Sequence, residues 1–360
     1  MNKKILMAVF GPIQTDSRVI RSAETLHSAG FNITVLSCNS LDYHNDSFRS
    51  IDLKIKSSPY AIFIFWIKVW RWLKNHRDEI DLLYMHDYFM PLFGKYAAKK
   101  LKKKWVYDAH ELLIFRKGKA ENFRAKIFYY FEKVSIKNAD LVISANYERH
   151  RIIKSIYKLN NATYVQNIST VNVPKFTGVK DNIIVYQGVI TLARNLDLYI
   201  LAQKMLYAQY NYKLCFIGGG HDLEKMKDLV SRLDGEDYIT FTGRVTQSEM
   251  YKISSSAKIG IVSYSLEGLN NYYCAPNKIF EYASLGIPMV ATSQPFICRI
   301  FAKYGIGETF KPNDVNSYVD TIDKVIKNYD SYIKNLKSFL EDYKPSNESE
   351  RLIKYVSDLF

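Results

Sequence analysis

Short apolar runs of strand length alternate with helix-length segments along both halves of this 360-residue chain. The ten runs are residues 5–10, 31–37, 81–86, 104–109, 139–144, 182–188, 212–218, 238–243, 258–264 and 288–292. Apolar strands that alternate with helices are typical of parallel sheets covered on both faces. The polar, proline-containing residues 169–182 interrupt this rhythm, and we interpret them as a linker. The pattern predicts an α/β protein with two doubly wound, Rossmann-like domains that face each other across a cleft.

The length and the cysteine pattern narrow the class of protein further. Each half of the chain is long enough to bury its own core. The four cysteines lie far apart without a CxxC motif, so we predict neither a zinc site nor a disulfide framework. The first residues, MNKKILMAVFG, have too short an apolar run for a signal peptide and are interpreted as a buried strand. No run reaches the ~18 apolar residues of a membrane span, and we expect a cytoplasmic protein.

The net charge of +14 suggests an anionic partner. Nucleic acid is one candidate, but the chain has no zinc-finger, RNP or basic-zipper pattern. Much of the charge lies in the first half, where residues 95–104 contain six lysines. Residues 60–75 predict a helix in which cations spaced by three form a stripe beside an aromatic and aliphatic surface. Residues 116–133 repeat this basic and aromatic mixture.

A helix of this kind suits an anionic membrane interface. The side chains predicted to face the membrane are Trp66, Lys68, Trp70, Arg71 and Lys74. The alternative is a core helix with a solvated basic edge, because the apolar arc is wide. We expect the protein to be peripheral, at the inner face of the plasma membrane.

Residues 270–291 predict a loop, a helix, a turn and a strand in succession. Proline at 276 can begin a helix, glycine at 286 can end it, and proline at 288 prevents it from resuming. Inside the helix, Asn277, Lys278 and Glu281 share one face near the amino end. That end suits a phosphate, and a carboxylate one turn deeper could accept hydrogen bonds from sugar hydroxyls. The alternative is a surface pair of Lys278 and Glu281 on an ordinary amphipathic helix.

The wording of this segment, PNKIFEYASLGIPMVAT, resembles the donor-binding signature of family-4 retaining glycosyltransferases, which have the GT-B fold. Weaker landmarks of the family recur in order along nearly the whole chain: DSRVIRSAETLHSAG, YDAHEL, YQG with a following arginine, FIGGG and FTGR. The resemblance implies an acceptor-side domain over residues 1–172, to which a terminal helix at 345–360 crosses back. It implies a nucleotide-sugar-binding domain over residues 173–344.

The resemblance also implies roles for individual residues. The predicted donor-binding residues are Gly188, Arg194, Gly218, Gly219, Gly220, Arg244, Asn277, Lys278 and Glu281. The predicted catalytic residues are His110, Arg194 and Lys278, and the predicted acceptor-side residues are Gly11, Asp16 and Arg18. Asp16 could instead be only a helix N-cap, and His86 is a second, weaker histidine candidate. A nicotinamide-dependent enzyme is the rival interpretation, but the first strand lacks the G-x-G-x-x-G that would support it.

Two positions depart from the family pattern. Val189 stands where relatives carry the first of two basic residues that hold the diphosphate, and Lys278 is our candidate to replace that charge. Tyr273 stands where relatives often carry a first glutamate, so Glu281 is the only carboxylate of the pair. No D-x-D pair ends a strand, so we expect no metal and a leaving group stabilised by Arg194, Lys278 and a helix dipole. No carboxylate nucleophile is evident, which favours front-face departure and attack.

These inferences lead to one functional expectation and two alternatives. We expect a retaining glycosyltransferase that moves a sugar from a nucleotide-diphosphate donor, its co-substrate, to a glycan or lipid-linked glycan. Bacterial surface polysaccharide synthesis would explain the basic and aromatic first domain. The alternatives are a nucleotide- or glycan-binding protein that has lost catalysis, and a GT-B-fold nucleotide-sugar epimerase.

Overall fold

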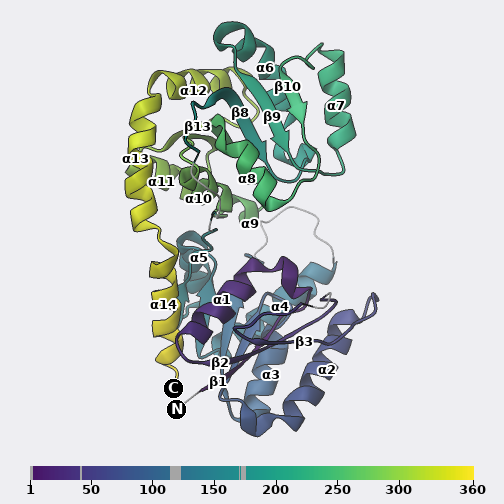
Figure 1. The fold of residues 1–360 in the computed structure, drawn as a ribbon. Helices are drawn as coiled ribbons and strands as arrows, with labels where there is room; N and C mark the ends of the chain where they lie inside the picture. The colour runs from purple at the N-terminus through teal and green to yellow at the C-terminus, as the bar shows by residue number, and fades with distance from the viewer. Residues whose placement is uncertain (1–2, 41–42, 114–122, 170, 172–175) are drawn as a thin grey trace. The chain divides into compact units, whose positions relative to one another are not determined.

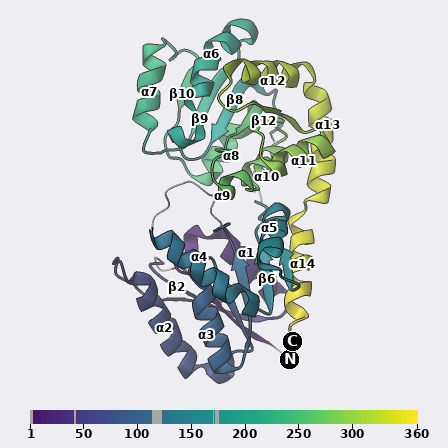
Figure 2. The same cartoon turned by 180° about the vertical axis from the view of Figure 1, so that it is seen from behind.

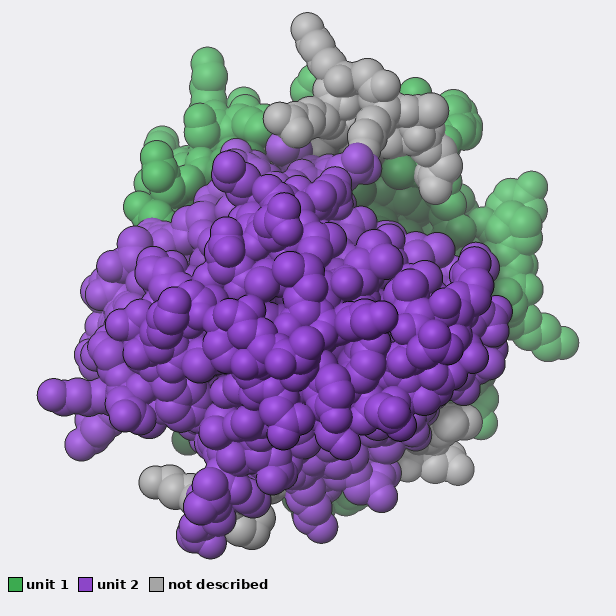
Figure 3. Space-filling model, turned by 90° about the horizontal axis from the view of Figure 1, so that it is seen from above, with its two compact units in different colours: residues 1–167, 346–360 green, residues 168–345 purple. Residues whose placement is uncertain are grey.

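The computed structural model describes residues 3–40, 43–113, 123–169, 171 and 176–360. The chain divides into two compact units, shown in Figures 1 and 3. Unit 1 comprises Met1–Asn167 and Ser346–Phe360, and unit 2 comprises Ile168–Pro345. Each unit contains one sheet.

Unit 1 contains a seven-stranded sheet in the order β3-β2-β1-β4-β5-β6-β7. Every neighbouring pair is parallel, and the chain winds outward from β1 in both directions, as predicted. The strands are β1 (Lys4–Ala8), β2 (Asn32–Ser37), β3 (Arg49–Asp52), β4 (Leu82–His86), β5 (Lys104–Ala109), β6 (Leu141–Ser144) and β7 (Ala162–Tyr164). The prediction missed β3 and β7, since these edge strands are only partly buried and lack an apolar run.

Helices α2, α3 and α4 lie side by side on one face of this sheet (Figure 2). The α-helices of unit 1 are α1 (Ser17–Ser28), α2 (Ala61–Asn75), α3 (Pro91–Leu101), α4 (Phe123–Ser135), α5 (Tyr147–Tyr157) and α14 (Pro345–Ser357). Short 3-10 turns are η1 (Ile13–Thr15), η2 (Arg77–Glu79) and η3 (Ile136–Asn138). The helix predicted over 60–75 is therefore present as α2. Residues 116–122 of the third basic segment lie outside the described residues.

Unit 2 contains a six-stranded parallel sheet in the order β10-β9-β8-β11-β12-β13. Its strands are β8 (Asp181–Gln187), β9 (Lys213–Ile217), β10 (Ile239–Phe241), β11 (Ala257–Val262), β12 (Met289–Thr292) and β13 (Gly307–Phe310). Its helices are η4 (Leu192–Arg194), α6 (Asp197–Tyr210), α7 (Leu223–Arg232), α8 (Gln247–Ser255), α9 (Leu269–Tyr272), α10 (Asn277–Ser284), α11 (Pro295–Tyr304), α12 (Val315–Lys327) and α13 (Tyr329–Asp342). Separate apolar clusters fill the two faces, one beneath α6, α7 and α12 and one beneath α8, α10, α11 and α13.

The last helix, α14, is part of unit 1. Leu352 and Val356 are buried in the same apolar cluster as Val19 and Leu26 of α1. The Glu348 carboxylate accepts a hydrogen bond from a backbone N–H of the segment that leaves unit 1, at 2.7 Å. The terminal helix is therefore held to unit 1 by both apolar and polar contacts.

One carboxyl group on α4 is buried. Glu132 is 1% exposed and accepts hydrogen bonds from Tyr107 at 2.6 Å and Tyr157 at 2.8 Å. Burial raises the pKa of Glu132 to about 7, although the two phenol hydrogen bonds act in the opposite direction. A raised pKa in the folded state means that the group stabilises the fold most when it is protonated, at low pH.

Replacing Glu132 with glutamine should therefore change how stability depends on pH. The stabilisation from Glu132 is complete below about pH 4.5 and is lost as the pH rises through about 7. The glutamine of Glu132→Gln stays neutral at every pH. We therefore expect the free energy of unfolding of the variant, relative to that of the wild type, to rise by about 1–3 kcal/mol between about pH 5 and pH 8. Denaturant unfolding across this range measures the difference, and the exposed Glu341→Gln is the control. A difference that does not vary with pH would contradict the raised pKa.

Candidate functional site

Two cations converge on the backbone immediately after β8. At Gly188, where φ is +137°, an added Cβ would lie 3.1 Å from Lys278 Nζ and 3.2 Å from Arg194 Nη1. Lys278 is the second residue of α10, and Arg194 ends η4. A strand end, a turn and a helix start therefore bring two positive charges to one point in unit 2.

The partners of these cations are phenol groups. Arg194 Nη1 donates to the Tyr186 hydroxyl at 2.8 Å, and Lys278 Nζ donates to the Tyr264 hydroxyl at 3.3 Å. Both cations also lie over the Tyr264 ring, at 4.8 and 5.2 Å from its centroid. Within the described parts of the chain, neither cation forms an ion pair with a carboxylate. The arrangement leaves two positive charges available to an anionic ligand.

Lys278 remains cationic in this setting. Burial lowers the pKa of Lys278, but the nearby oxygens of Tyr264 and Tyr186 outweigh burial, and the net shift is upward. The amino end of α10, on which this residue stands, adds partial positive charge.

Three glycines follow β9, and all three contact the loop after β8. A Cβ on Gly218 would be 2.1 Å from the carbonyl oxygen of Gly188, and one on Gly220 would be 1.9 Å from that of Ile190. The Ile190 N–H also donates to the carbonyl of Gly219 at 3.0 Å. The close approach of two backbones therefore requires glycine here. The predicted phosphate-binding role of these glycines stays a prediction.

Glu281 lies one turn deeper in α10 and is 7% exposed. Its carboxylate accepts hydrogen bonds from the Gln187 amide and, at 3.4 Å, from the Tyr251 hydroxyl. The Gln187 amide is itself oriented by Ser254, which donates to its oxygen at 2.9 Å. Gln187, Tyr251 and Ser254 were not predicted from the sequence. Only the position of Gln187 directly before Gly188 could have indicated it.

We call Gly188, Arg194, Lys278 and the three glycines after β9 the cradle. The remaining predicted donor-side residues lie around it. Asn277 begins α10, and its buried side-chain oxygen has no hydrogen-bond partner among the described residues, so it can accept one from a ligand. Arg244 lies against Gly219, where a Cβ would be 2.7 Å from its side chain. Val189 is 52% exposed, and Tyr273 directly follows α9 and contacts its neighbouring tyrosine ring. Beside Gly188 the positive charges therefore come from Arg194 and Lys278, and Arg244 adds a third cation beside Gly219.

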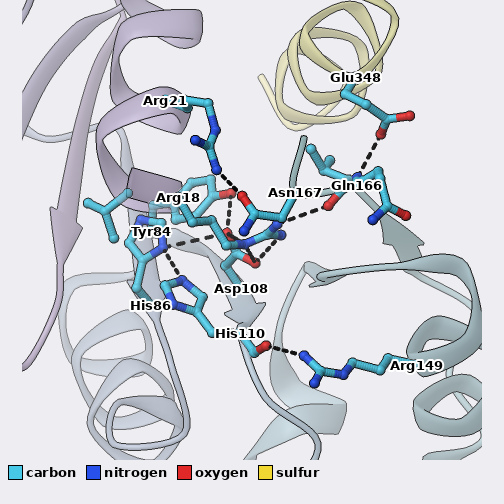
Figure 4. A network of polar contacts seen from close by, with 12 residues as sticks. Arg18, Arg21, Tyr84, His86, Asp108, His110, Arg149, Gln166, Asn167 and Glu348 are labelled. Carbon is cyan, nitrogen blue, oxygen red and sulfur yellow. Dashed lines mark hydrogen bonds and ion pairs between the residues drawn. The ribbon is translucent and has the colours of Figure 1, made fainter. Parts of the chain in front are cut away.

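In unit 1 the predicted histidine lies at the carboxyl end of β5. Figure 4 shows His110 beside His86, which ends β4; Nε2 of His110 and Nδ1 of His86 are 3.1 Å apart. The other ring nitrogen of His110, Nδ1, is 3.5 Å from Asp16. The carbonyl of His110 accepts a hydrogen bond from Arg149 at 2.6 Å. Adjacent parallel strands thus place two histidines together that are 24 residues apart in the chain.

A buried ion pair lies beneath these histidines. Arg18 donates to Asp108 from Nε at 3.0 Å and from Nη2 at 2.6 Å, and Tyr84 donates to the same carboxylate at 3.2 Å. Burial raises the pKa of Asp108, but the charge of Arg18 and the hydrogen bond from His86 together outweigh burial and hold that pKa well below its usual range. The third guanidinium nitrogen donates to the carbonyl of Val165 at 2.9 Å.

This pair corrects one expectation for the acceptor side. Arg18 is 7% exposed, and its guanidinium donates to Asp108 and to the carbonyl of Val165 inside unit 1. Contrary to the prediction, it is not accessible to an acceptor. Asp16 caps α1 by accepting from two backbone N–H groups, and it also lies beside His110. A Cβ added to Gly11 would meet no atom of the described residues within 4 Å, so the space beside Gly11 is open as far as these residues are concerned. An acceptor-side role for Gly11 and Asp16 stays a prediction.

His86, Asp108 and His110 offer ligand atoms that lie within 4.8 Å of one another. Arg18 already supplies the positive charge that Asp108 requires, at 2.6 Å. A divalent cation here would be repelled by that guanidinium, which stays protonated in proteins. The donor set therefore does not suit a metal, and we propose none.

The helix predicted to face a membrane is more buried than expected. The ammonium group of Lys68 donates to the carbonyls of Leu53 at 2.6 Å and Lys54 at 3.0 Å. It is therefore bound within unit 1, and the prediction that Lys68 faces the membrane is wrong. Trp66 and Trp70 are half-buried and contact Phe93, Phe131 and Tyr96 on α3 and α4. The tryptophans therefore join α2 to its neighbours.

Other side chains of α2 are exposed. These are Phe63 at 42%, Ile64 at 40% and Ile67 at 52%, together with Arg71 and Lys74. Exposed cations and aromatic rings continue over α3 and α4 at Tyr96, Lys99, Lys100, Phe123, Arg124, Lys126 and Tyr130. We call this set of residues the α2–α4 surface. Among the described residues, no helix is both long and apolar enough to cross a bilayer.

Comparison with known proteins places both units in one family. Residues 167–354 match the family model of glycosyl transferases group 1, and residues 17–165 match that of glycosyltransferase family 4. An uncharacterized glycosyltransferase of Haemophilus influenzae is 22% identical over 325 residues, which is 87% of each chain.

Solved structures share the fold over the whole length. HepE of Anabaena in complex with UDP is 13% identical with a TM-score of 0.77, over 99% of this chain and all of that one. WaaG, a glycosyltransferase involved in lipopolysaccharide biosynthesis, is 14% identical with a TM-score of 0.71, over 97% of this chain and 98% of that one. With its two parallel Rossmann-like sheets, this chain has the GT-B fold, and it belongs to the group 1, family 4 glycosyltransferases.

Proposed function

We propose that this protein transfers a sugar from a nucleoside-diphosphate donor to a glycan or lipid-linked glycan, with retention of configuration, in surface polysaccharide synthesis. The observation that carries the proposal is the convergence of Arg194 and Lys278 on Gly188. Two cations held by phenols and an aromatic ring, with no carboxylate partner among the described residues, fit the two phosphates of such a donor. The family membership supports the same substrate class.

The donor is a UDP-sugar in this proposal. HepE of Anabaena has been solved with UDP and also with UDP-glucose, which supports uridine as the base and a hexose as the sugar. The Glu281 carboxylate has two protein donors, and its remaining lone pairs can accept the ribose hydroxyls. The side-chain oxygen of Asn277, which has no partner in the described part of the chain, can accept a further hydrogen bond from the same ligand.

Catalysis rests on charge stabilisation at the leaving diphosphate. Negative charge grows there as the glycosidic bond breaks, and Arg194, Lys278 and the amino end of α10 stabilise it. The departing phosphate then takes the proton of the attacking hydroxyl on the same side of the sugar. His110 of unit 1 contacts the transferred sugar in this scheme.

One alternative retains a specific basis. Val189 leaves the cradle with a single arginine where relatives of the family carry two basic residues in this loop. A nucleotide-binding protein without catalysis would also fit that loss. Hydrolysis of a panel of nucleotide sugars without acceptor separates the two, because only a transferase turns over its donor. Absence of turnover with every donor would favour the binding protein.

Nucleotide binding should depend on the Glu281 carboxylate. Glu281→Gln should weaken UDP binding by roughly 1.5–3 kcal/mol, because a hydrogen bond to a charged group is lost. The loss should disappear with 2′,3′-dideoxy UDP, which lacks the hydroxyls that Glu281 is proposed to bind. Calorimetric titration measures both, and the exposed Glu224→Gln is the control. Equal affinity of wild type and variant for UDP would return Glu281 to a structural role.

Turnover should depend on Arg194 and should not depend on a metal. Arg194→Ala should lower kcat by roughly 10²–10³-fold, because the charge it meets grows in the transition state, and should change the donor affinity much less. Donor hydrolysis should continue in EDTA. The exposed Arg232→Ala of the same unit is the matched control. Loss of activity in EDTA with rescue by manganese would overturn this mechanism.

We propose that the α2–α4 surface attaches the protein to anionic membrane. Its exposed apolar side chains, Phe63, Ile64 and Ile67, can enter the interface while Arg71 and Lys74 bind lipid phosphates. Lys95 takes no part, because it donates to the carbonyl of Val134 at 2.8 Å. Each cation close to an anionic surface contributes about 1 kcal/mol, so several suffice for reversible binding.

Vesicle co-sedimentation tests the attachment. Binding should be strong with anionic lipid, weak with neutral lipid, and reduced by salt. Arg71→Gln with Lys74→Gln should release the protein from vesicles without changing donor hydrolysis. Lys204→Gln with Lys252→Gln, two exposed lysines of unit 2, is the charge-matched control. If the wild type stays in the supernatant with anionic vesicles at low salt, the α2–α4 surface does not bind membrane.

A further inference from the structure

In unit 1, the ring of His86 lies between the carboxylate of Asp108 and the ring of His110 (Figure 4). Nδ1 of His86 is 3.5 Å from Oδ2 of Asp108 and 3.1 Å from Nε2 of His110. His86 and Asp108 are both fully buried, and the His86 ring is stacked on Tyr84 at 4.6 Å. Because these groups are shielded from bulk water, the position of each proton depends on the neighbouring groups.

The charge on Asp108 decides the proton position on His86. Arg18 pairs with Asp108 through two nitrogens, so the carboxylate is ionised and can only accept hydrogen bonds. A lone pair on His86 Nδ1 would be repelled by that carboxylate, so Nδ1 carries the proton. The opposite tautomer would also bury an N–H at Nε2, which has no partner among the described residues.

The proton position on His86 in turn decides that on His110. His86 presents an N–H to Nε2 of His110, which must therefore be the nitrogen with the lone pair. Burial lowers the pKa of His110 to about 4 against the attraction of Asp108, so the ring is neutral near pH 7. A neutral ring with its lone pair at Nε2 carries its single proton at Nδ1.

We propose that His86 is a positioning residue that holds His110 as the Nδ1–H tautomer, so that His110 acts as a neutral hydrogen-bond donor. Nδ1 of His110 is 3.5 Å from Asp16, beyond the usual hydrogen-bond length of about 2.7–3.2 Å. Its N–H is therefore available to an oxygen atom of a ligand. The His110 side chain is 15% exposed, so a ligand can reach the ring.

The proposal assigns a chemical task to His110 and excludes another. The lone pair at Nε2 is occupied by His86, so His110 does not remove a proton from the acceptor hydroxyl. Its Nδ1–H can hold a hydroxyl or ring oxygen of the donor sugar. This last step rests on the proposed glycosyltransferase function, whereas the tautomer itself does not.

NMR of the free protein labelled with ¹⁵N-histidine tests the tautomer directly. The two nitrogens of a neutral histidine differ strongly in ¹⁵N shift according to which one carries the proton. The His110 signals, assigned through their loss in His110→Asn, should show protonated Nδ1 and unprotonated Nε2 near neutral pH. A protonated Nε2 in the wild type would overturn the proposal.

Variants of His86 test the positioning role. His86→Phe keeps the ring stacked on Tyr84 but removes the donor, so we expect His110 to shift toward the Nε2–H tautomer. His86→Gln retains an amide donor and should keep Nδ1–H, and it remains informative if His86→Phe fails to fold. The exposed His44→Gln is the control. An unchanged His110 tautomer in folded His86→Phe, or loss of Nδ1–H in His86→Gln, would contradict the role.

Kinetics connect the tautomer to function. His86→Phe should lower kcat by about tenfold or more, because a misplaced histidine proton disables catalysis, and His86→Gln should restore most of it. UDP affinity should be the same in both variants and the wild type, since the proposed nucleotide contacts belong to unit 2. Parallel loss of UDP affinity in His86→Phe would indicate a general structural effect. If the wild type transfers no sugar but the tautomer is as expected, the proposed function fails and the positioning role stands.

Discussion

The buried ion pair of Arg18 and Asp108 is the interaction on which the polar interior of unit 1 depends. It joins α1 to β5 and, through the carbonyl of Val165, to the segment that leaves the unit. Because Arg18 keeps Asp108 ionised, the same pair determines which nitrogen of His86 is protonated. Removing either partner would leave a buried charge unpaired, at a cost of about 3–5 kcal/mol. The pair is therefore needed both for the fold and for the state of the histidines.

In unit 2, by contrast, two cations are held in place without an ion pair among the described residues. Arg194 and Lys278 lie close together without a carboxylate partner in the described structure, supported by the ring of Tyr264 and by two phenol oxygens. An aromatic ring attracts a cation but does not neutralise it. The two charges are thus positioned while most of their electrostatic attraction remains available to a ligand. In the proposed function, the diphosphate of the donor would replace these weak partners without breaking an ion pair.

Much of the fold could be predicted from the sequence, because buried parallel strands are continuous apolar runs and their helices have their own start and stop signals. All ten predicted strands are present, and α2 and α10 lie where the pattern placed them. The strands β3, β7 and β13 were missed, since edge strands need no continuous apolar run. In the site, the position of Lys278 beside Glu281 on one helix was also accessible, because both lie within a single turn.

The sequence by itself determined the α/β class, the two-part organisation, and which local segments carry charge at strand ends and helix starts. Only the tertiary structure decided which of those charges are paired. Arg18 and Lys68 are both cations on amphipathic helices. Arg18 pairs with Asp108, whereas Lys68 donates to backbone carbonyls of a distant loop. Gln187 and Tyr251 acquire their roles from Glu281, which is remote from both in the chain. Periodicity reports the burial of a side chain, whereas its hydrogen-bond partner depends on contacts between elements that local sequence does not encode.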